Sequence, residues 1–352
     1  MDKVMADIKN EEYEMIWNQV KDFMPGSSSI LITGANGLIA SNIVDVLMYF
    51  NEVYKLKNHI FALCRSEEKA EKRFSQYLED SEFQILSQDI CDFHMEQACD
   101  YIIHAASNAH PLAYSTKPVE TMKTNIIGTM KILEYAWMNG VKKIVYVSTS
   151  EVYGENQGDR LVESEYGRVN TLNPRSCYSE SKRCAETFCA CYCREKKLDI
   201  SIVRPGYIYG AQITEDNSRA DAQFLRDVIS GKNIVMKSEG RQRRSYCYVA
   251  DSVSAIFYTM VYGKCGEAYN IANCDSEASI REYAQTLAEQ GGVELQFEIP
   301  SDVEKKGYSV VKNSLMSDNK LRKLGWIPQY DLSHGVERML ENVSRTKEVE
   351  NG

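Results

Sequence analysis

The fold of this chain is decided by one stretch, ILITGANGLIAS at residues 30–41. Its β-branched start predicts a short strand, and residues 42–51 follow a helical pattern. A strand, a glycine turn and a helix in this order are the context of a dinucleotide-binding fingerprint. Gly34 permits the tight turn, Gly37 lets the backbone approach a pyrophosphate at the helix N-terminus, and Ala40 still allows close packing. The turn residues that we expect to contact a dinucleotide are Gly34, Asn36, Gly37, Leu38 and Ile39.

Further strands recur along the chain, with helical segments between them. Short apolar runs lie at residues 59–65, 83–86, 101–106, 143–148, 202–204 and 269–272. Alternating strands and helices predict an α/β fold with a doubly wound parallel sheet of the Rossmann type. A length of 352 residues leaves room for a smaller C-terminal α/β substrate lobe. The expected parts are a helical extension at 1–28, the Rossmann domain at 29–205, a lobe at 206–345 that returns strands to the sheet, and a tail at 346–352.

Composition narrows the classes of function. The chain has 41 basic and 50 acidic residues, a net charge of −9 and no basic stripe, which argues against a nucleic-acid partner. Its eleven cysteines are scattered and its five histidines are dispersed, so we expect structural thiols in a reducing cytoplasm and no metal site. The N-terminal residues lack the apolar core of a signal peptide, and no apolar run approaches the roughly 18–20 residues of a membrane span. No membrane partner is therefore expected.

The end of the second predicted strand bears on which dinucleotide binds. An acidic residue there would bind the ribose hydroxyls of NAD, but this chain has Cys64-Arg65-Ser66. Arginine pairs with a 2′-phosphate and stacks on adenine, so Arg65 favours NADP. The alternative, an exposed Arg65 beside bound NAD, stays open. Further candidates for cofactor contact follow the third and fourth strands, namely Asp89, Ile90, Ala105 and Ala106.

A second motif supplies groups that can move a proton. Tyr178 and Lys182 are four residues apart in a helical stretch, so their side chains share one face. An ammonium beside a phenol lowers the phenol pKa, and the hydroxyl of Thr149 can share the same substrate oxygen. Together these three residues form a general base that removes a proton from an alcohol while hydride leaves the carbon. A YxxxK pair alone is common, but this pair follows both the glycine turn and the strand end STSEVYG at 148–154.

These motifs together resemble the extended short-chain dehydrogenase/reductase family, which contains nucleotide-sugar epimerases, dehydratases and decarboxylases. The resemblance covers about residues 29–345. Within the family, the chain is most similar to the UDP-glucuronate decarboxylase (UDP-xylose synthase) branch. The phrases that carry this similarity are STSEVYG at 148–154, YGRVN at 166–170, PRSCY at 174–178 and RSYCYVAD at 244–251.

The resemblance implies further contacts and a partner. Residues 117–129 are similar to the helix that lines the cofactor in these enzymes, which implies a contact from Asn125. In dimers of this family the helix at 119–139 and the helix after Tyr178 pair in a four-helix bundle, so a homodimer is expected. The role of residues 1–28 is left open between a lid, an interface arm and a surface helix.

The resemblance also implies a reaction through a 4-keto sugar. Tyr178 as phenolate, helped by Lys182 and Thr149, takes the proton of the C4 hydroxyl while hydride passes to nicotinamide. A 4-keto sugar with a C6 carboxylate is a β-keto acid and loses carbon dioxide. Glu151 favours this outcome, because decarboxylases and dehydratases carry an acid there and simple 4-epimerases usually lack one. The alternative is a partly buried Glu151 that only pairs with a nearby cation such as Arg175. The alternatives are an NADP-dependent 4-epimerase, a 4,6-dehydratase, a 4-keto reductase and a cofactor-sensing regulator without catalysis.

Substrate contacts are expected from loops at the strand ends and from the second half of the chain. Arg219 and Arg244 are the candidate phosphate ligands, and Ser107 and Arg175 are further candidates for substrate contact. Tyr207 stands where family members often have an asparagine that touches the sugar or the diphosphate. The segment 315–318 lacks the arginine that many members use to hold the diphosphate, so the sugar and the nucleotide stay open.

Overall fold

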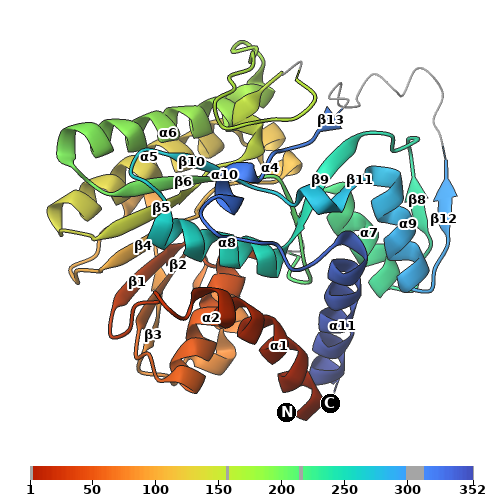
Figure 1. Ribbon diagram of the computed structural model, residues 1–352, viewed down its shortest axis with the longest axis horizontal. Helices are drawn as coiled ribbons and strands as arrows, with labels where there is room; N and C mark the ends of the chain where they lie inside the picture. The colour runs from red at the N-terminus through yellow and green to blue at the C-terminus, as the bar shows by residue number, and fades with distance from the viewer. Residues whose placement is uncertain (1–2, 156–157, 214–216, 299–312, 352) are drawn as a thin grey trace.

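Within residues 3–155, 158–213, 217–298 and 313–351, which the computed structural model describes, a seven-stranded parallel sheet forms the centre of the molecule (Figure 1). Its strands are β1 (Ser29–Thr33), β2 (His59–Cys64), β3 (Phe83–Ser87), β4 (Tyr101–His104), β5 (Lys143–Val147), β6 (Ile200–Pro205) and β10 (Ala268–Ile271). Their order across the sheet is β10-β6-β5-β4-β1-β2-β3. The strands expected from the apolar runs are therefore confirmed.

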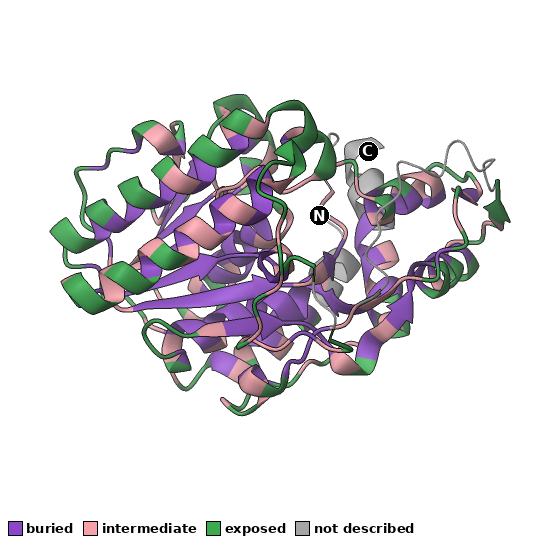
Figure 2. Cartoon of the chain, turned by 90° about the horizontal axis from the view of Figure 1, so that it is seen from above, coloured by how far each residue is buried: buried purple, intermediate pink, exposed green. Residues whose placement is uncertain are grey.

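The central strands are buried because helices cover both faces of the sheet. Figure 2 shows the strands as the purple centre of the molecule. Strands covered on both faces read as continuous apolar runs instead of alternating ones, as β1 and β2 do. Strand β1 has β2 on one side and β4 on the other, so the strand order reverses there. Ligands of doubly wound sheets bind at the carboxyl ends of the strands at such a point.

The helices of the main sheet form two layers (Figure 1). They are α1 (Lys3–Val20), α2 (Leu38–Tyr54), α3 (Glu67–Arg73), α4 (Pro111–Thr116), α5 (Pro118–Met138), α6 (Cys177–Lys196) and α8 (Val249–Tyr262). Helices α5 and α6 pack together on one face, and α1, α2 and α8 lie on the other. None of the described helices combines the length and the apolarity that crossing a bilayer would demand.

The second half of the chain builds a smaller α/β lobe beside the sheet. Its helices are α7 (Ala220–Ile229), α9 (Ile280–Gln290), α10 (Asn319–Arg322) and α11 (Leu332–Asn351). Its strands are β7 (Tyr207–Tyr209), β8 (Ile234–Met236), β9 (Arg243–Tyr248), β11 (Glu277–Ser279), β12 (Leu295–Phe297) and β13 (Asn313–Ser314). Strand β9 pairs with β7 and β13 in parallel and with β11 in antiparallel orientation. This lobe faces the carboxyl end of the main sheet.

The chain crosses between the two parts more than once, because α8 and β10 return to the main sheet after β9. Helix α11 runs through Asn351, so the residues expected to form a tail continue that helix. The proposed limits at 28/29 and 205/206 stay predictions.

Helix α1 joins the two parts. Trp17 stacks on Tyr54 of α2, with ring centroids 3.8 Å apart. The buried carboxylate of Glu12 accepts hydrogen bonds from the Tyr248 hydroxyl of β9 at 2.8 Å and from the Asn342 amide of α11 at 3.2 Å. One helix therefore contacts the sheet layer and the small lobe at the same time.

Candidate active site

The glycine turn between β1 and α2 leaves backbone groups available to an anion. Gly34 has a φ of +67°, and a Cβ there would lie 2.7 Å from the Ala106 Cα, so only glycine fits. The helix begins after Gly37 with no side-chain cap on its first N–H groups. Among the described side-chain atoms, Asn36 Oδ1 is buried without a hydrogen-bond partner. The turn thus fits the pyrophosphate and ribose of a dinucleotide, which offer both acceptors and donors.

The ends of β1 and β4 meet at this turn. The Thr33 hydroxyl accepts hydrogen bonds from the N–H groups of Ala105 at 3.1 Å and Ala106 at 3.0 Å. Leu38 and Ile39 open α2 directly above. The structure therefore brings these predicted cofactor contacts to one edge of the sheet.

A polar chain leads from this edge to helix α6. The Ser107 hydroxyl donates to Asn125 Oδ1 at 2.7 Å, and Asn125 Nδ2 donates to the Ser181 hydroxyl at 2.9 Å. Ser107 also lies close enough to Tyr178 to lower the pKa of its phenol. The predicted contacts Ser107 and Asn125 thus lie beside the phenol.

The side chains of Tyr178 and Lys182 both lie at the carboxyl end of β5, next to Thr149 and Val147. Tyr178 is 4% exposed, and the hydroxyls of Thr149 and Ser107 lie close enough to its phenol to act on its pKa, which they lower. Burial, followed by the charge of Glu151, raises the pKa of the phenol above its usual value. The Lys182 ammonium donates to the Val147 carbonyl at 2.8 Å.

Burial opposes the charged forms of both Tyr178 and Lys182. Burial lowers the pKa of Lys182 to about 7, because the charged ammonium is destabilised when it is removed from water. The pKa of Tyr178 is raised, because burial of the phenol outweighs the nearby positive charges. The three groups are together as predicted, but the phenol is protonated at neutral pH in this arrangement.

Glu151 is held by Arg175. The Arg175 guanidinium donates to both oxygens of Glu151, at 2.9 and 3.1 Å. The same guanidinium lies 4.2 Å from the centroid of the Tyr114 ring and donates to its hydroxyl at 3.2 Å. Tyr114 in turn stacks on Tyr178, with centroids 5.2 Å apart and planes 24° apart. The carboxylate and the phenol therefore belong to one layered cluster.

Tyr114 is a site residue that the sequence analysis did not name, although a signal for it existed. Pro111 stands at the first turn of α4, where proline favours a helix start. A helix that starts there places the aromatic side chain of Tyr114 one turn later, in the segment that follows β4. Tyr114 is buried between Arg175 and Tyr178.

The small lobe contributes three of the predicted substrate residues. Arg219 precedes α7 and donates to the Ala109 carbonyl at 2.9 Å, across the junction of the two parts. Its charge also acts to lower the pKa of Tyr178. The Arg244 guanidinium lies 3.9 Å from the centroid of the Tyr207 ring. Arg219 therefore acts on the Tyr178 phenol, and Arg244 lies against Tyr207 on the neighbouring strand; both are cations that suit an anionic substrate.

The remaining predicted cofactor residues, Arg65, Asp89 and Ile90, follow strands β2 and β3. Arg65 follows β2, and its guanidinium donates to a carboxylate oxygen of Glu120 on α5 at 2.6 Å. Asp89 is exposed and caps the turn at Cys91, accepting its N–H at 2.8 Å. Ile90 packs on α5, where a Cβ at Gly128 would lie 2.7 Å from its side chain.

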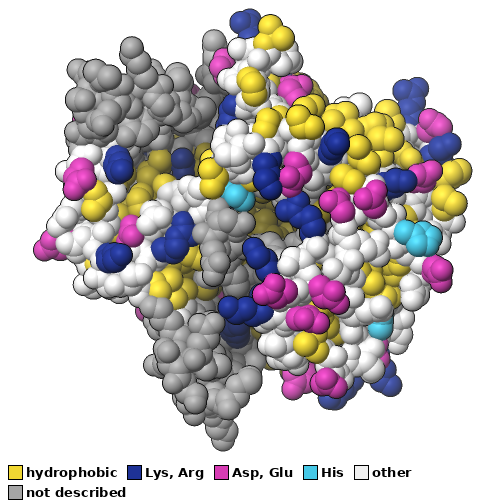
Figure 3. All heavy atoms as spheres, turned by 180° about the vertical axis from the view of Figure 1, so that it is seen from behind, with side chains coloured by type: hydrophobic (Ala, Val, Ile, Leu, Met, Phe, Trp, Pro, Cys, Tyr) yellow, Lys and Arg dark blue, Asp and Glu magenta, His cyan; other side chains and the backbone are white. Residues whose placement is uncertain are grey.

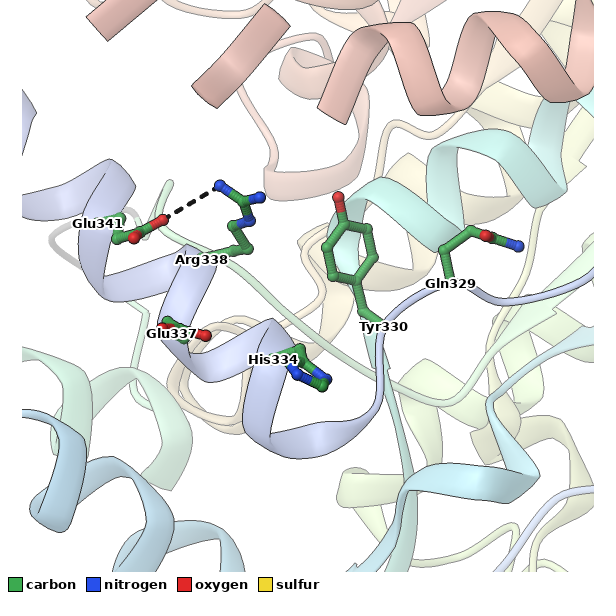
Figure 4. Close-up of a pocket in the computed structure, with 6 residues that line it drawn as sticks. All are labelled: Gln329, Tyr330, His334, Glu337, Arg338 and Glu341. Carbon is green, nitrogen blue, oxygen red and sulfur yellow. Dashed lines mark hydrogen bonds and ion pairs between the residues drawn. The ribbon is translucent and has the colours of Figure 1, made fainter. Parts of the chain in front are cut away.

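A hollow of about 280 Å³ lies away from these residues. Its lining residues are Gln329, Tyr330, His334, Glu337, Arg338 and Glu341 (Figure 4). Arg338 pairs with Glu341 at 3.3 Å and with Glu11 of α1 at 2.7 Å. The hollow is thus part of the junction of α1 and α11 and contains none of the predicted site residues. In the described ranges no three His, Cys, Asp or Glu side chains gather as metal ligands would.

Comparison with known proteins agrees with this geometry. Residues 30–272 match the model of the NAD dependent epimerase/dehydratase family. UDP-glucuronic acid decarboxylase 6 of Arabidopsis thaliana is 33% identical over 329 residues, which cover 91% of this chain and 90% of that protein. UDP-glucuronic acid decarboxylase 1 of Danio rerio is 28% identical, covering 91% of this chain and 73% of that protein.

Solved structures share the architecture. The UDP-glucose 4-epimerase of Thermotoga maritima, solved with UDP-glucose, matches with a TM-score of 0.76 at 25% identity, covering 91% of this chain and 99% of that one. The UDP-glucuronic acid 4-epimerase of Bacillus cereus, solved with UDP-glucuronic acid and NAD, has the same fold, with a TM-score of 0.77, 22% identity and coverage of 90% and 99%. The glycine turn, the Tyr178–Lys182 pair and these matches lead to one conclusion: the chain belongs to the NAD dependent epimerase/dehydratase family.

Proposed function

We propose that this chain is a nucleotide-sugar enzyme that decarboxylates UDP-glucuronate or a close relative through a 4-keto intermediate. The observation that carries the proposal is the similarity to UDP-glucuronic acid decarboxylase 6 over 91% of the chain. The site supports it, because a carboxylate, Glu151, lies in the same cluster as the Tyr178 phenol.

In the proposed reaction a bound oxidised dinucleotide supplies the hydride acceptor. Tyr178 accepts the proton of the sugar C4 hydroxyl, while Thr149 and Ser107 orient the phenol oxygen. Lys182 sits below the phenol, and its ammonium favours the phenolate once it is charged. Arg219 and Arg244 hold the diphosphate and orient the sugar above Tyr178.

Glu151 and Arg175 act on the other end of the sugar ring. A sugar carboxylate at C6 would compete with Glu151 for the Arg175 guanidinium, because both are carboxylates that suit a bidentate pair. Binding would then release Glu151 to hold a ring hydroxyl or to carry the proton that replaces carbon dioxide. A neutral sugar would leave the Glu151–Arg175 pair intact.

The test is turnover of a panel of UDP-, GDP-, CDP- and TDP-sugars, with the nucleotide sugar identified by mass spectrometry. UDP-glucuronate is expected to lose about 44 mass units, the mass of carbon dioxide, with no added cofactor consumed. Loss of about 18 mass units from a neutral sugar would instead indicate a dehydratase, and an unchanged mass with an altered sugar would indicate a 4-epimerase. Binding of a dinucleotide without turnover of any sugar would indicate a cofactor-sensing regulator without catalysis.

The choice between NAD and NADP is a finer proposal. The family is NAD dependent, and we propose that Arg65 lets this chain accept NADP as well, with a preference for NADP. Arg65 follows β2, where the adenosine ribose lies in such folds, and its side chain is 59% exposed. Its ion pair with Glu120 opposes this preference, since the carboxylate competes with a 2′-phosphate for the guanidinium.

Two variants measure that competition. Glu120→Gln is expected to strengthen NADPH binding roughly fivefold without changing NADH binding, because it removes the competing charge beside Arg65. Arg65→Ala is expected to weaken NADPH binding by about tenfold, again with NADH unchanged. Fluorescence titration of the two reduced dinucleotides gives the ratio directly. An unchanged ratio in both variants would contradict the role of Arg65.

We also propose that the chain works as a homodimer in the cytoplasm. Helix α5 exposes a stripe of large apolar side chains, namely Val119, Met122, Ile127, Met130, Trp137 and Met138. Figure 3 shows hydrophobic side chains gathered over this part of the molecule, at the upper right. A stripe of this kind on one helix is typical of a surface that a partner covers. The eleven cysteines are free thiols, which supports a reducing compartment.

A further inference from the structure

Two thiols far apart in the sequence lie together at the edge of the main sheet. Cys193 is in the last turn of α6, and Cys265 is in the loop between α8 and β10. The Ile200 carbonyl accepts hydrogen bonds from the Cys193 thiol and from the N–H of Gly266, the residue after Cys265, so the two cysteines lie side by side. Cys193 is half-buried and Cys265 is exposed. None of the proposed chemistry uses either residue.

The surrounding backbone holds both sulfurs in place. The Cys193 thiol is 3.6 Å from the Ile200 carbonyl, and the Cys265 thiol is 3.3 Å from the Leu198 carbonyl. The N–H of Gly266 donates to the Ile200 carbonyl at 2.8 Å, which fixes the loop to the start of β6. A Cβ at Gly266, the residue after Cys265, would lie 3.9 Å from the Cβ of Cys193, so this loop packs against the last turn of α6.

The two thiols differ in reactivity. Burial, together with the neighbouring Cys265 thiol, raises the pKa of Cys193 to about 12. Cys265 is open to solvent, so a soluble oxidant meets it first. An accessible attacking thiol beside a half-buried second thiol is the arrangement in which a mixed disulfide is resolved within the chain.

We propose that Cys193 and Cys265 form a reversible intramolecular disulfide on contact with a small disulfide oxidant such as oxidised glutathione. The Cys265 thiolate attacks one sulfur of the oxidant, whose S–S bond breaks and releases one glutathione thiolate. Cys193 then gives its proton to solvent and attacks the Cys265 sulfur, which releases the second glutathione. The two cysteines lose two electrons in total, and one oxidised glutathione becomes two reduced molecules.

The bond would tie the C-terminal end of α6 to the loop that leads into the edge strand β10. Closing a long loop in this way limits the unfolded chain and slows the opening of the sheet edge. Tyr178 is at the other end of α6, fifteen residues away, or roughly 22 Å along the helix. The modification is therefore expected to raise the melting temperature without changing turnover more than twofold.

The experiment oxidises the full chain with oxidised glutathione, quenches it with acid, blocks remaining thiols and analyses proteolytic peptides by mass spectrometry. The expected product is a linked pair of peptides containing Cys193 and Cys265, about 2 mass units lighter than the two together, and dithiothreitol reverses it. The melting temperature of the oxidised protein is expected to rise by a few degrees.

Three variants distinguish this disulfide from general thiol oxidation. Cys193→Ser is expected to stop at a mixed glutathione disulfide on Cys265, and Cys265→Ser is expected to leave Cys193 unmodified. Cys191→Ser, which removes an exposed cysteine of the same helix, is expected to keep the linked pair. A stable mixed disulfide on Cys265 in the unaltered chain, or loss of the linked pair in Cys191→Ser, would overturn the proposal.

Discussion

At the scale of single residues, the cluster around Tyr178 shows how burial and charge oppose each other. Burial raises the pKa of the phenol and lowers the pKa of Lys182 to about 7. Both shifts favour the neutral forms, so near pH 7 the phenol is protonated and Lys182 is only about half charged. A proton acceptor arises only when a further positive charge or a bound hydroxyl favours the phenolate. Proton removal therefore depends on the presence of both the dinucleotide and the sugar substrate.

Tyr178→Phe tests this role directly. The variant keeps the ring that stacks on Tyr114 and loses only the hydroxyl, so turnover is expected to fall roughly 1,000-fold with little change in melting temperature. Steady-state rates on the substrate identified in the panel, together with thermal melts, give both quantities. Tyr192→Phe makes the same substitution on the same helix and serves as the control. Full turnover by Tyr178→Phe would contradict the mechanism.

At the scale of secondary-structure elements, α1 is the helix whose role the sequence left open. It contacts α2 through Trp17, and its buried Glu12 contacts both β9 and α11. On the same turn, Glu11 forms an ion pair with Arg338 at 2.7 Å. Burial raises the pKa of Glu12 to about 7, although hydrogen bonds from Tyr248 and Asn342 oppose that shift. The helix thus connects the sheet to the small lobe through a carboxyl group that is sensitive to pH.

Glu12→Gln is expected to change how stability depends on pH. The folded chain keeps the Glu12 proton up to about pH 7 and the unfolded chain releases it near 4.5, so stability falls as pH rises between these values. The glutamine variant has no such loss. It should gain up to about 3 kcal/mol relative to the unaltered chain between pH 4.5 and 7.5.

Denaturant unfolding at several pH values measures this difference. Glu11→Gln removes an exposed charge from the same turn and is the matched control. Parallel curves for Glu12→Gln and the unaltered chain across this range would show that Glu12 does not titrate with folding.

At the scale of the whole molecule, the site lies where the small lobe meets the carboxyl end of the main sheet. Arg219, at the start of α7, donates to the Ala109 carbonyl of the loop after β4, so the lobe is attached at the site itself. The apolar stripe of α5 lies on the outer side of the sheet and away from the small lobe (Figures 1 and 3). A partner on α5 would therefore leave the junction of the two parts accessible to substrate.

Met130→Glu tests the proposed homodimer. Met130 is 43% exposed in the middle of α5, and a carboxylate there would be desolvated by a partner, so the variant is expected to be monomeric at micromolar concentration. Light scattering coupled to size-exclusion chromatography measures the mass. Leu78→Glu, at a similarly exposed apolar position outside α5, is expected to remain dimeric. A monomeric mass for the unaltered chain would contradict the proposed homodimer.

Much of the fold was predictable because its signals are local. The glycine turn at 34–37 and the runs of buried β-branched residues require only near neighbours to form a strand, a turn and a helix. The spacing of Tyr178 and Lys182 likewise places both side chains on one helix face. The Tyr178 core of the candidate site could therefore be named before the structure was known.

The rest depends on contacts between distant segments. The ring of Tyr114 on Tyr178 and the Cys193–Cys265 contact join residues from different elements, which no spacing in the sequence encodes. The Arg175–Glu151 pair could be anticipated only as one of two interpretations of Glu151. The charge states of Tyr178 and Lys182 were also beyond the sequence, because a pKa depends on burial. The sequence by itself determined the sheet, the glycine turn and the residue types that do the chemistry. Only the tertiary structure decided which charges meet, since desolvation and pairing arise when the chain packs.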